Sequence, residues 1–402
     1  IEYVNAITDV SQIKFTPDSK LIETVGPEID RMFLEDVHSL SLSPESDKRH
    51  AAMKIVYTPL HGVGSRLMYR SLEKWGFDMV IHVPEQDIQN GDFPTVKSPN
   101  PENHEALDMA IEKARRVDAD IVLAADPDAD RIALVVRDKN GEYQLVNGNQ
   151  LVMLLLCYII TRNAELGKIT GSEYCVKTIV TTETIKRIAD ANNVRCFDCF
   201  TGFKWIADVM RGMEGKGRYI GGGEESYGFL AESFVRDKDS ISANSLMAEM
   251  AAWCADKGLN LYEFLIDIYA KYGFSRERGV SVVRPGKSGA DEIIAMMKNF
   301  RENPPKQLGG SPVVAVKDYS DLTCRDLRSG ETTSLDFPAT SNVLQFFTES
   351  GDKVSIRPSG TEPKIKFYVE VREEMSCKEK YEETVAQAEQ HIDQILADLG
   401  VK

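Results

Sequence analysis

The feature that most constrains the fold is a pattern of strand, turn, helix and strand that occurs twice. The first copy opens with the apolar run MKIVYT at 53–58 and closes with MVIHV at 79–83. The second runs from YCVKTIVTT at 174–182 to VRCFDCF at 194–200. A helix that joins two neighbouring strands in this order forms a βαβ unit. The pattern predicts repeated α/β domains with mixed, largely parallel sheets.

The residues after about 276 follow a different pattern, in which strands alternate with turns. IKFYVEV at 365–371 places apolar side chains at every second position, as in a half-buried strand. A helix is expected from about 377 to the end of the chain. This part of the sequence therefore predicts a C-terminal α+β domain.

Residues 1–50 are expected to form a lead-in and not a domain. Their pattern is mostly helical, and six apolar residues have helical spacing: Leu21, Ile22, Val25, Ile29, Met32 and Phe33. The chain begins without an initiator Met, so we expect that an N-terminal portion has been removed.

Composition limits the partners and the compartment. The chain has 402 residues and a formal net charge of −15, which argues against nucleic acid and membrane surfaces as partners. Its seven cysteines are scattered and odd in number, which suits a reducing compartment, and we predict a cytoplasmic protein. The apolar run at 151–160 is shorter than the roughly 20 residues of a membrane helix.

An acidic motif, ADPDADR at 125–131, directly follows the apolar run at 121–124. Asp126, Asp128 and Asp130 can converge on one hard cation at the carboxyl end of a strand, and their oxygens favour Mg²⁺ or Ca²⁺. Arg131 is placed to bind a phosphate oxygen. Arg137 stands at the position where an EF-hand loop needs Glu, so an EF-hand is excluded. The alternative is a solvated acidic loop.

The second motif is IGGGEESYGF at 220–229. Its three glycines are expected to let the backbone approach a ligand closely. Glu224 and Ser226 supply a carboxylate and a hydroxyl that suit neighbouring sugar hydroxyls. An ordinary glycine turn with a charged tip is the alternative.

The third motif is IRPSGTEPKIKF at 356–367. Arg357, Ser359, the Gly360 amide and Thr361 make a compact set of donors of the kind that a phosphate monoester needs. The alternative is that this segment is only the loop by which the chain leaves a β-hairpin.

Three features carry weaker signals. Lys204 follows a glycine turn and Lys238 lies between two aspartates, and by themselves both would be surface residues. HGVG at 61–64 is a glycine turn before a helix. It lacks the Lys-Ser/Thr of a P-loop, so a structural role is favoured over phosphate binding.

Together these motifs resemble the α-D-phosphohexomutase family, most closely its phosphoglucomutase/phosphomannomutase type. The motifs are, in order, TPLHGVG, ADPDADR, TGFKW, GEESYG, RDKD and RPSGTEP. The resemblance implies an isomerase of carbohydrate metabolism with four domains round a cleft. Such an enzyme moves a phosphoryl group between hexose 1-phosphate and hexose 6-phosphate, through phosphoserine, Mg²⁺ and glucose 1,6-bisphosphate, which acts as intermediate and activator.

The resemblance also implies roles for individual residues. Asp126, Asp128 and Asp130 would be the Mg²⁺ ligands, and Arg131, next to Asp130, would contact the phosphoryl group. Thr201 would line the sugar site, Glu224 and Ser226 would bind the sugar hydroxyls, and Lys238 would contact the substrate. The second phosphate would be held by Arg357, Ser359, Gly360 and Thr361. Arg131, Lys204 and Lys238 are the catalytic candidates, Lys204 the weaker one for proton transfer.

One departure from the family is large. A serine motif of the type Thr-x-Ser-His-Asn-Pro is absent, and the nearest stretch is KSPNP at 97–101, where Ser98 lacks the histidine. We therefore expect a fragment without the serine-bearing domain, inactive by itself. The expected parts are a linker at 1–50, a metal-binding domain at 51–170, a sugar-binding domain at 171–275 and a phosphate-binding domain at 276–402.

Several alternatives stay open at this point. The chain could be a non-catalytic phosphosugar-binding protein, a phosphopentomutase, or a Mg²⁺-dependent phosphatase with Asp126 as nucleophile. The sugar could be glucose, mannose, a pentose or an amino sugar, with a tilt towards glucose. A phosphorylated hexose is the expected partner, and the sequence does not predict an oligomeric state.

Overall fold

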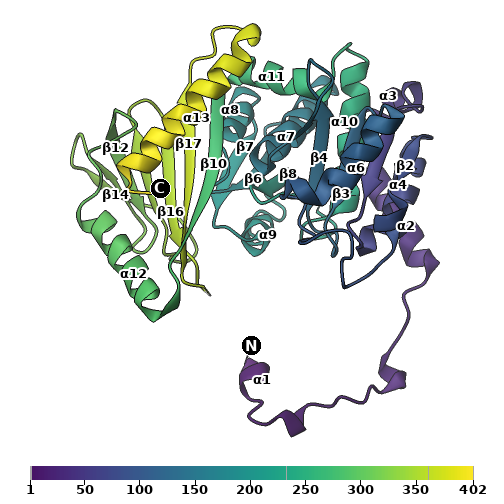
Figure 1. Cartoon of the computed structure of the whole chain (residues 1–402), viewed down its shortest axis with the longest axis horizontal. Coiled ribbons are helices and arrows are strands. Elements are labelled where there is room, and N and C mark those ends of the chain that lie inside the picture. Colours follow the sequence, from purple (N-terminus) through teal and green to yellow (C-terminus); the bar gives the residue numbers. More distant parts are fainter. Residues whose placement is uncertain (1, 232, 361, 402) are drawn as a thin grey trace.

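The computed structural model describes residues 2–231, 233–360 and 362–401, and three sheets with their helices make up its body (Figure 1). The first two sheets have mixed, mainly parallel strands and the third is antiparallel, so the predicted fold class is confirmed. The predicted domain limits stay a prediction.

The first sheet has the strand order β2-β1-β3-β4-β5. Its strands are β1 (Ile55–Thr58), β2 (Val80–His82), β3 (Ile121–Ala125), β4 (Ile132–Arg137) and β5 (Tyr143–Leu145). Successive side chains of β1 and β3 enter two different apolar clusters, because alternate residues of a strand face opposite sides. One face packs against α6 (His104–Val117), and α4 (Met68–Trp75) lies on the other. The short helix α5 covers Pro84–Asp87.

The second sheet has the order β7-β6-β8-β9. Its strands are β6 (Glu173–Thr178), β7 (Arg195–Cys199), β8 (Arg218–Glu224) and β9 (Gly228–Leu230), with α8 (Thr184–Ala191) and α9 (Phe203–Gly212) beside them. Both predicted βαβ units are present, since β1 and β2 pair in parallel, as do β6 and β7.

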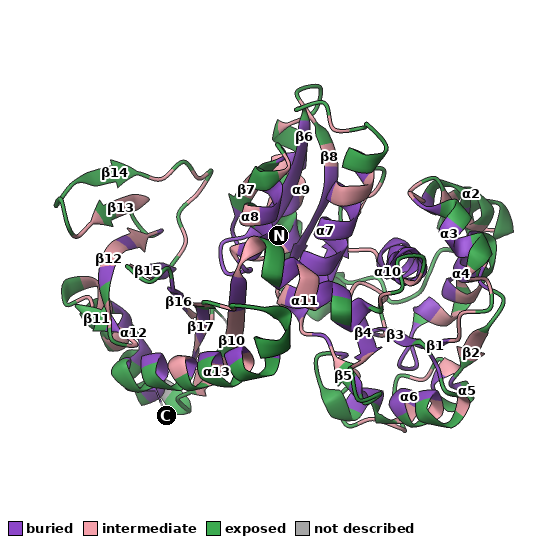
Figure 2. Cartoon of the chain, turned by 90° about the horizontal axis from the view of Figure 1, so that it is seen from above, coloured by how far each residue is buried: buried purple, intermediate pink, exposed green. Residues whose placement is uncertain are grey.

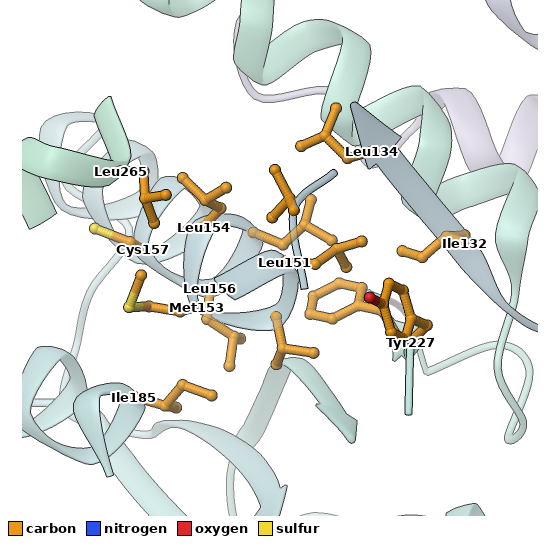
Figure 3. Close-up of a cluster of buried hydrophobic side chains, with 14 of the residues drawn as sticks. Ile132, Leu134, Leu151, Met153, Leu154, Leu156, Cys157, Ile185, Tyr227 and Leu265 are labelled. Atoms are coloured by element: carbon orange, nitrogen blue, oxygen red, sulfur yellow. The ribbon is translucent and has the colours of Figure 1, made fainter. Parts of the chain in front are cut away.

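Three helices fill the space between these sheets: α7 (Gly148–Glu165), α10 (Ser240–Ala255) and α11 (Leu261–Tyr272). Figure 2 shows α10 as a buried helix between the two sheets. Side chains of α7 reach β4, α8 and α11 in one apolar cluster, where Leu151 and Leu156 lie near Ile132 and Ile185 (Figure 3). This core fixes the first sheet against the second. No helix in the described ranges is long and apolar enough to span a membrane.

The third sheet has the order β10-β17-β16-β15-β12-β13-β14. Its strands are β10 (Phe274–Val283), β12 (Ser311–Asp318), β13 (Thr323–Asp326), β14 (Thr332–Ser334), β15 (Leu344–Thr348), β16 (Lys353–Pro358) and β17 (Lys364–Glu373), and β11 (Gln307–Leu308) pairs with β12. Ile365, Phe367, Val369 and Val371 are buried, as the alternation predicts. Helices α12 (Gly286–Glu302) and α13 (Tyr381–Asp398) complete this part.

The helical prediction for the lead-in is wrong at its start. Helix α2 covers Pro27–His38, and Leu21, Ile22 and Val25 lie before it with exposed side chains. Pro27 stands at the first helical position, where proline is favoured because its missing N–H is not needed there. Before it lie the short helix α1 (Glu2–Asn5) and an exposed stretch that runs away from the body (Figure 1), while α3 (Pro44–Arg49) packs against α10.

Candidate functional site

The acidic motif forms the tight loop between β3 and β4. One carboxylate oxygen from each of Asp126, Asp128 and Asp130 lies within 4.8 Å of the others. Oδ1 of Asp126 accepts hydrogen bonds from the backbone N–H groups of Asp130, at 3.1 Å, and Arg131, at 2.8 Å. The second oxygen of the buried Asp126 and the side chains of the other two aspartates are therefore free of these backbone bonds. An oxygen-only set of this kind fits a hard divalent cation.

The electrostatics of the loop also fit a cation. Burial and, to a smaller extent, the charges of Asp130 and Asp128 together raise the pKa of Asp126 to about 7, against the hydrogen bond from the Arg131 backbone, which lowers it. The ammonium of Lys238 lies 3.0 Å from Asp130 and 2.9 Å from Asp237. Nε of Arg131 also lies 3.8 Å from Asp126, so two cationic side chains face the three carboxylates of the loop, and a bound cation would offset the remaining repulsion.

Two neighbouring segments hold the acidic loop in place. The backbone N–H of Val63, in the HGVG turn, donates to the Pro127 carbonyl at 2.9 Å. On the other side, the N–H of Ser240, at the start of α10, donates to the Ala129 carbonyl at 3.1 Å. His61 is buried and bonds the Ile88 carbonyl at 2.9 Å. These contacts give the glycine turn the structural role that the sequence favoured.

Gly221, Gly222 and Gly223 of the second motif are not among the residues that line the polar cavity of the described structure, and their approach to a ligand stays a prediction. They lie in β8, and a side chain on Gly221 would meet Leu156 of α7 at 2.9 Å. A side chain on Gly222 would meet the Val176 carbonyl at 2.6 Å. Glycine is required there because α7 and β6 pack closely on this strand.

A polar cavity of about 620 Å³ lies where the three sheets meet. Five of the predicted site residues line it: Arg131, Thr201, Glu224, Ser226 and Arg357. They come from the β3–β4 loop, the β7–α9 loop, the end of β8, the β8–β9 turn and β16. The volume is in the range of small-molecule sites, about 300–1,000 Å³. Residues far apart in the sequence therefore share one hollow.

The other described residues of the predicted site lie outside the lining: Asp126, Asp128, Asp130, Lys204, Lys238, Ser359 and Gly360. Lys238 reaches the acidic loop through Asp130, whereas Lys204 is exposed and lies 5.1 Å from the Trp205 ring centre. Ser359 and Gly360 follow β16 beyond Arg357. Thr361 lies outside the described residues.

Several lining residues were not predicted. Glu102 lies 3.4 Å from the guanidinium of Arg131, and Lys353, Lys366 and Tyr368 come from the third sheet. Glu225, an acceptor in the GEESYG motif, also lines the cavity. The alternation of β17 is the signal that could have found Lys366 and Tyr368. If Ile365 and Phe367 face the core, their neighbours must face the other side.

The turn between β8 and β9 has its own electrostatics. Burial raises the pKa of the Glu224 carboxyl, and the adjacent Glu225 raises it further, while Lys238, Ser226 and Arg131 lower it. The turn packs on the first residues of α7, since a side chain on Gly148 would come within 2.7 Å of the carbonyl carbon of Glu225. The backbone N–H of Ile132 donates to the Tyr227 carbonyl at 3.0 Å, so this turn is joined to the end of the acidic loop (Figure 3).

Family models match three consecutive parts of the chain. Residues 31–141 match "Phosphoglucomutase/phosphomannomutase, alpha/beta/alpha domain II", residues 147–272 match domain III of the same description, and residues 298–388 match its C-terminal domain. These matches cover most of the chain.

Curated relatives agree with the family models. A phosphoglucomutase from Staphylococcus epidermidis is 36% identical over 355 residues, which are 88% of this chain and 63% of that protein. A phosphoglucomutase from Staphylococcus aureus is 36% identical over 329 residues, 82% of this chain and 58% of that protein. The chain thus spans less than two thirds of the length of these relatives.

Solved structures share the fold. The open form of parafusin, a phosphoglucomutase from Paramecium, is 17% identical with a TM-score of 0.66 and covers 93% of this chain and 62% of that one. A phosphoglucomutase/phosphomannomutase family protein from Burkholderia thailandensis is 16% identical with a TM-score of 0.60 and covers 92% and 65%. The family models and the curated relatives together establish that the chain belongs to the phosphoglucomutase/phosphomannomutase family.

Proposed function

We propose that this chain binds a phosphorylated hexose with Mg²⁺ and serves the interconversion of hexose 1-phosphate and hexose 6-phosphate. The observation that supports the proposal most strongly is the shared cavity. It offers Arg357 on the third sheet, Glu224 and Ser226 on the second, and Arg131 beside the acidic loop of the first. A hexose phosphate has an anionic end, which the two arginines can bind, and a ring of hydroxyls, which Glu224 and Ser226 can bind.

The acidic loop would serve the phosphoryl group in transfer. Asp126, Asp128 and Asp130 would hold Mg²⁺, which neutralises charge on a phosphoryl group when bound. Arg131 would donate to the phosphoryl oxygens, and its contact with Glu102 keeps the guanidinium at the cavity wall. The role of the acidic loop and Arg131 would be to position the phosphoryl group and to stabilise its charge.

The second and third sheets would hold the rest of the substrate. Glu224, Ser226 and Thr201 would bond the sugar hydroxyls, and Lys238 would contact the substrate from beside Asp130. Arg357, Ser359, Gly360 and Thr361 would hold the phosphate that is not being transferred. Lys204 is the weaker candidate for proton transfer, because its side chain is exposed and lies outside the lining.

Glucose is the favoured sugar and mannose the second. The preference for glucose comes from the motifs GEESYG and TGFKW, and the curated relatives, which are phosphoglucomutases, support it. The proposed cycle uses a phosphoserine as donor and glucose 1,6-bisphosphate as intermediate. In it, one phosphoryl group passes to the sugar and the other returns to the serine, so two anion sites are needed. The cytoplasm is the proposed location.

Isothermal titration with glucose 6-phosphate in the presence of Mg²⁺ tests the proposal. We expect saturable binding to the chain, weakened by Arg357→Met and by Glu224→Gln. Exposed Arg328, on a turn after β13, provides the matched control, so Arg328→Met should bind as the wild type does. Absence of binding to the wild type, or equal binding by all four proteins, would refute the proposed function.

A further inference from the structure

The face of the third sheet that looks into the cavity carries charge in two rows. Glu277 of β10 lies opposite Glu370 of β17, and Glu370 lies opposite Lys353 of β16, so these three residues form one row. Four positions further along this strand pair, Arg357 lies opposite Lys366 in another row. All five residues line the cavity. One sheet face thus supplies both an anion-binding edge and a mixed-charge edge.

The mixed-charge row is fastened to the second sheet. Nζ of Lys353, whose side chain is only 2% exposed, donates to the Thr181 carbonyl at 2.9 Å and to Glu183 at 2.7 Å, and lies 3.1 Å from Glu370. Glu370 in turn accepts from the backbone N–H of Glu183 at 2.9 Å. From the other side, Lys177 of β6 donates to the same Glu183 carboxylate at 2.9 Å. Each sheet therefore contributes a buried lysine to one carboxylate.

The segment that receives Lys353 also holds the turn that faces the sugar. The hydroxyl of Thr181 donates to Oε2 of Glu225 at 3.1 Å, and the hydroxyl of Thr178 donates to the same oxygen at 2.9 Å. Glu225 stands between Glu224 and Ser226. A continuous line of hydrogen bonds thus runs from strand β16, through residues 178–183, to the β8–β9 turn.

We propose that Lys353, Thr181 and Glu225 are positioning residues that set the separation between Arg357 and the pair Glu224 and Ser226. The proposal rests on the proposed function, since it concerns a ligand that must touch both groups at once. Arg357 lies four residues beyond Lys353 on β16, about 14 Å at the usual rise of a strand. Fixing Lys353 to Thr181 therefore fixes the strand that carries Arg357.

The physical reason is the gain from holding two anchors at one spacing. A ligand with a phosphate and a sugar ring binds its second anchor at an effective concentration that depends on how well the spacing is fixed. Inorganic phosphate has one anchor and gains nothing from the spacing. The three residues should therefore affect the two ligands differently.

The test uses the full chain and ³¹P NMR titration with glucose 6-phosphate and with inorganic phosphate. Lys353→Met should weaken the binding of glucose 6-phosphate about tenfold, or about 1.4 kcal/mol, and leave phosphate within about twofold. Thr181→Val, which keeps the carbonyl that accepts from Lys353, should act in the same direction and retain the fold. Exposed Lys306 supplies the matched control, Lys306→Met.

Two results would overturn the proposal. One is equal weakening of both ligands by Thr181→Val, which would mean that the phosphate site itself is damaged. The other is unchanged binding of glucose 6-phosphate by both Lys353→Met and Thr181→Val. Non-additive effects in the double variant would support the shared line of bonds.

The outcome separates this proposal from the proposed function. If the wild type binds no glucose 6-phosphate, the proposed function fails. Hydrogen exchange then tests separately whether Lys353 holds the β8–β9 turn in place. Amides of the β8–β9 turn should exchange faster in Lys353→Met than in Lys306→Met. Equal exchange in the two proteins would refute the coupling between β16 and the turn.

Discussion

The replacement Gly62→Ala should disturb the acidic loop from outside the cavity. An added Cβ would come within 2.6 Å of three backbone atoms of Pro127, where ordinary van der Waals contact begins at 3.4 Å. The loop must therefore withdraw by about 1 Å, and misplacement of that size in a built site can cost about 10²-fold. Overpacking of a tight contact costs about 1–3 kcal/mol of stability. We expect Mg²⁺ affinity to fall at least tenfold, together with a lower Tm.

Titration calorimetry with Mg²⁺ and thermal unfolding measure both effects. Gly91→Ala is the matched control, because nothing lies within 4 Å of the added Cβ and its φ is not in the left-handed region. The control should retain the affinity and the Tm of the wild type. Wild-type Mg²⁺ affinity in Gly62→Ala would refute the reasoning that this turn supports the acidic loop.

Three further outcomes are expected. Burial, and then the charge of Glu249 and a hydrogen bond to it, raise the pKa of Asp47 to about 9 from 3.8. The folded state therefore binds more protons than the unfolded state, and the free energy of unfolding falls as pH rises between these values. Between pH 5 and pH 8.5 the Tm of Asp47→Asn, measured by calorimetry, should fall less than the Tm of the wild type, and parallel curves would contradict this. Lys238→Met removes an ammonium 3.0 Å from Asp130, so Mg²⁺ should bind more tightly by about 1 kcal/mol at low salt, and unchanged calorimetric affinity would count against the electrostatic account. Arg357→Met should weaken inorganic phosphate by about 1.5–3 kcal/mol in a ³¹P NMR titration, and full retention would remove this residue from the phosphate site.

Much of the fold and part of the candidate site could be predicted from local sequence. The acidic loop follows from three aspartates directly after a buried run, because ligands of open α/β sheets gather at the carboxyl ends of strands. The βαβ units follow from runs of β-branched residues that alternate with helical patterns. The buried side of β17 follows from its period of two.

The remainder depends on contacts between distant segments. Nothing local to Lys353 says that it is buried against Thr181, since the two residues meet only when the third sheet packs on the second. The glycines of β8 look like a ligand-binding run in sequence, and the close packing of α7 and β6 on this strand gives a second reason for them. The helical face predicted from Leu21 onwards fails because Pro27 starts the helix later.

A crystal structure of the chain with glucose 1,6-bisphosphate and Mg²⁺ tests the central claim most directly. The account predicts one ligand in the shared cavity, with one phosphate on Arg357, ring hydroxyls on Glu224 and Ser226, and the other phosphate beside Arg131 and a cation on the acidic loop. A ligand bound elsewhere, or one that contacts the loop of only one sheet, would contradict it.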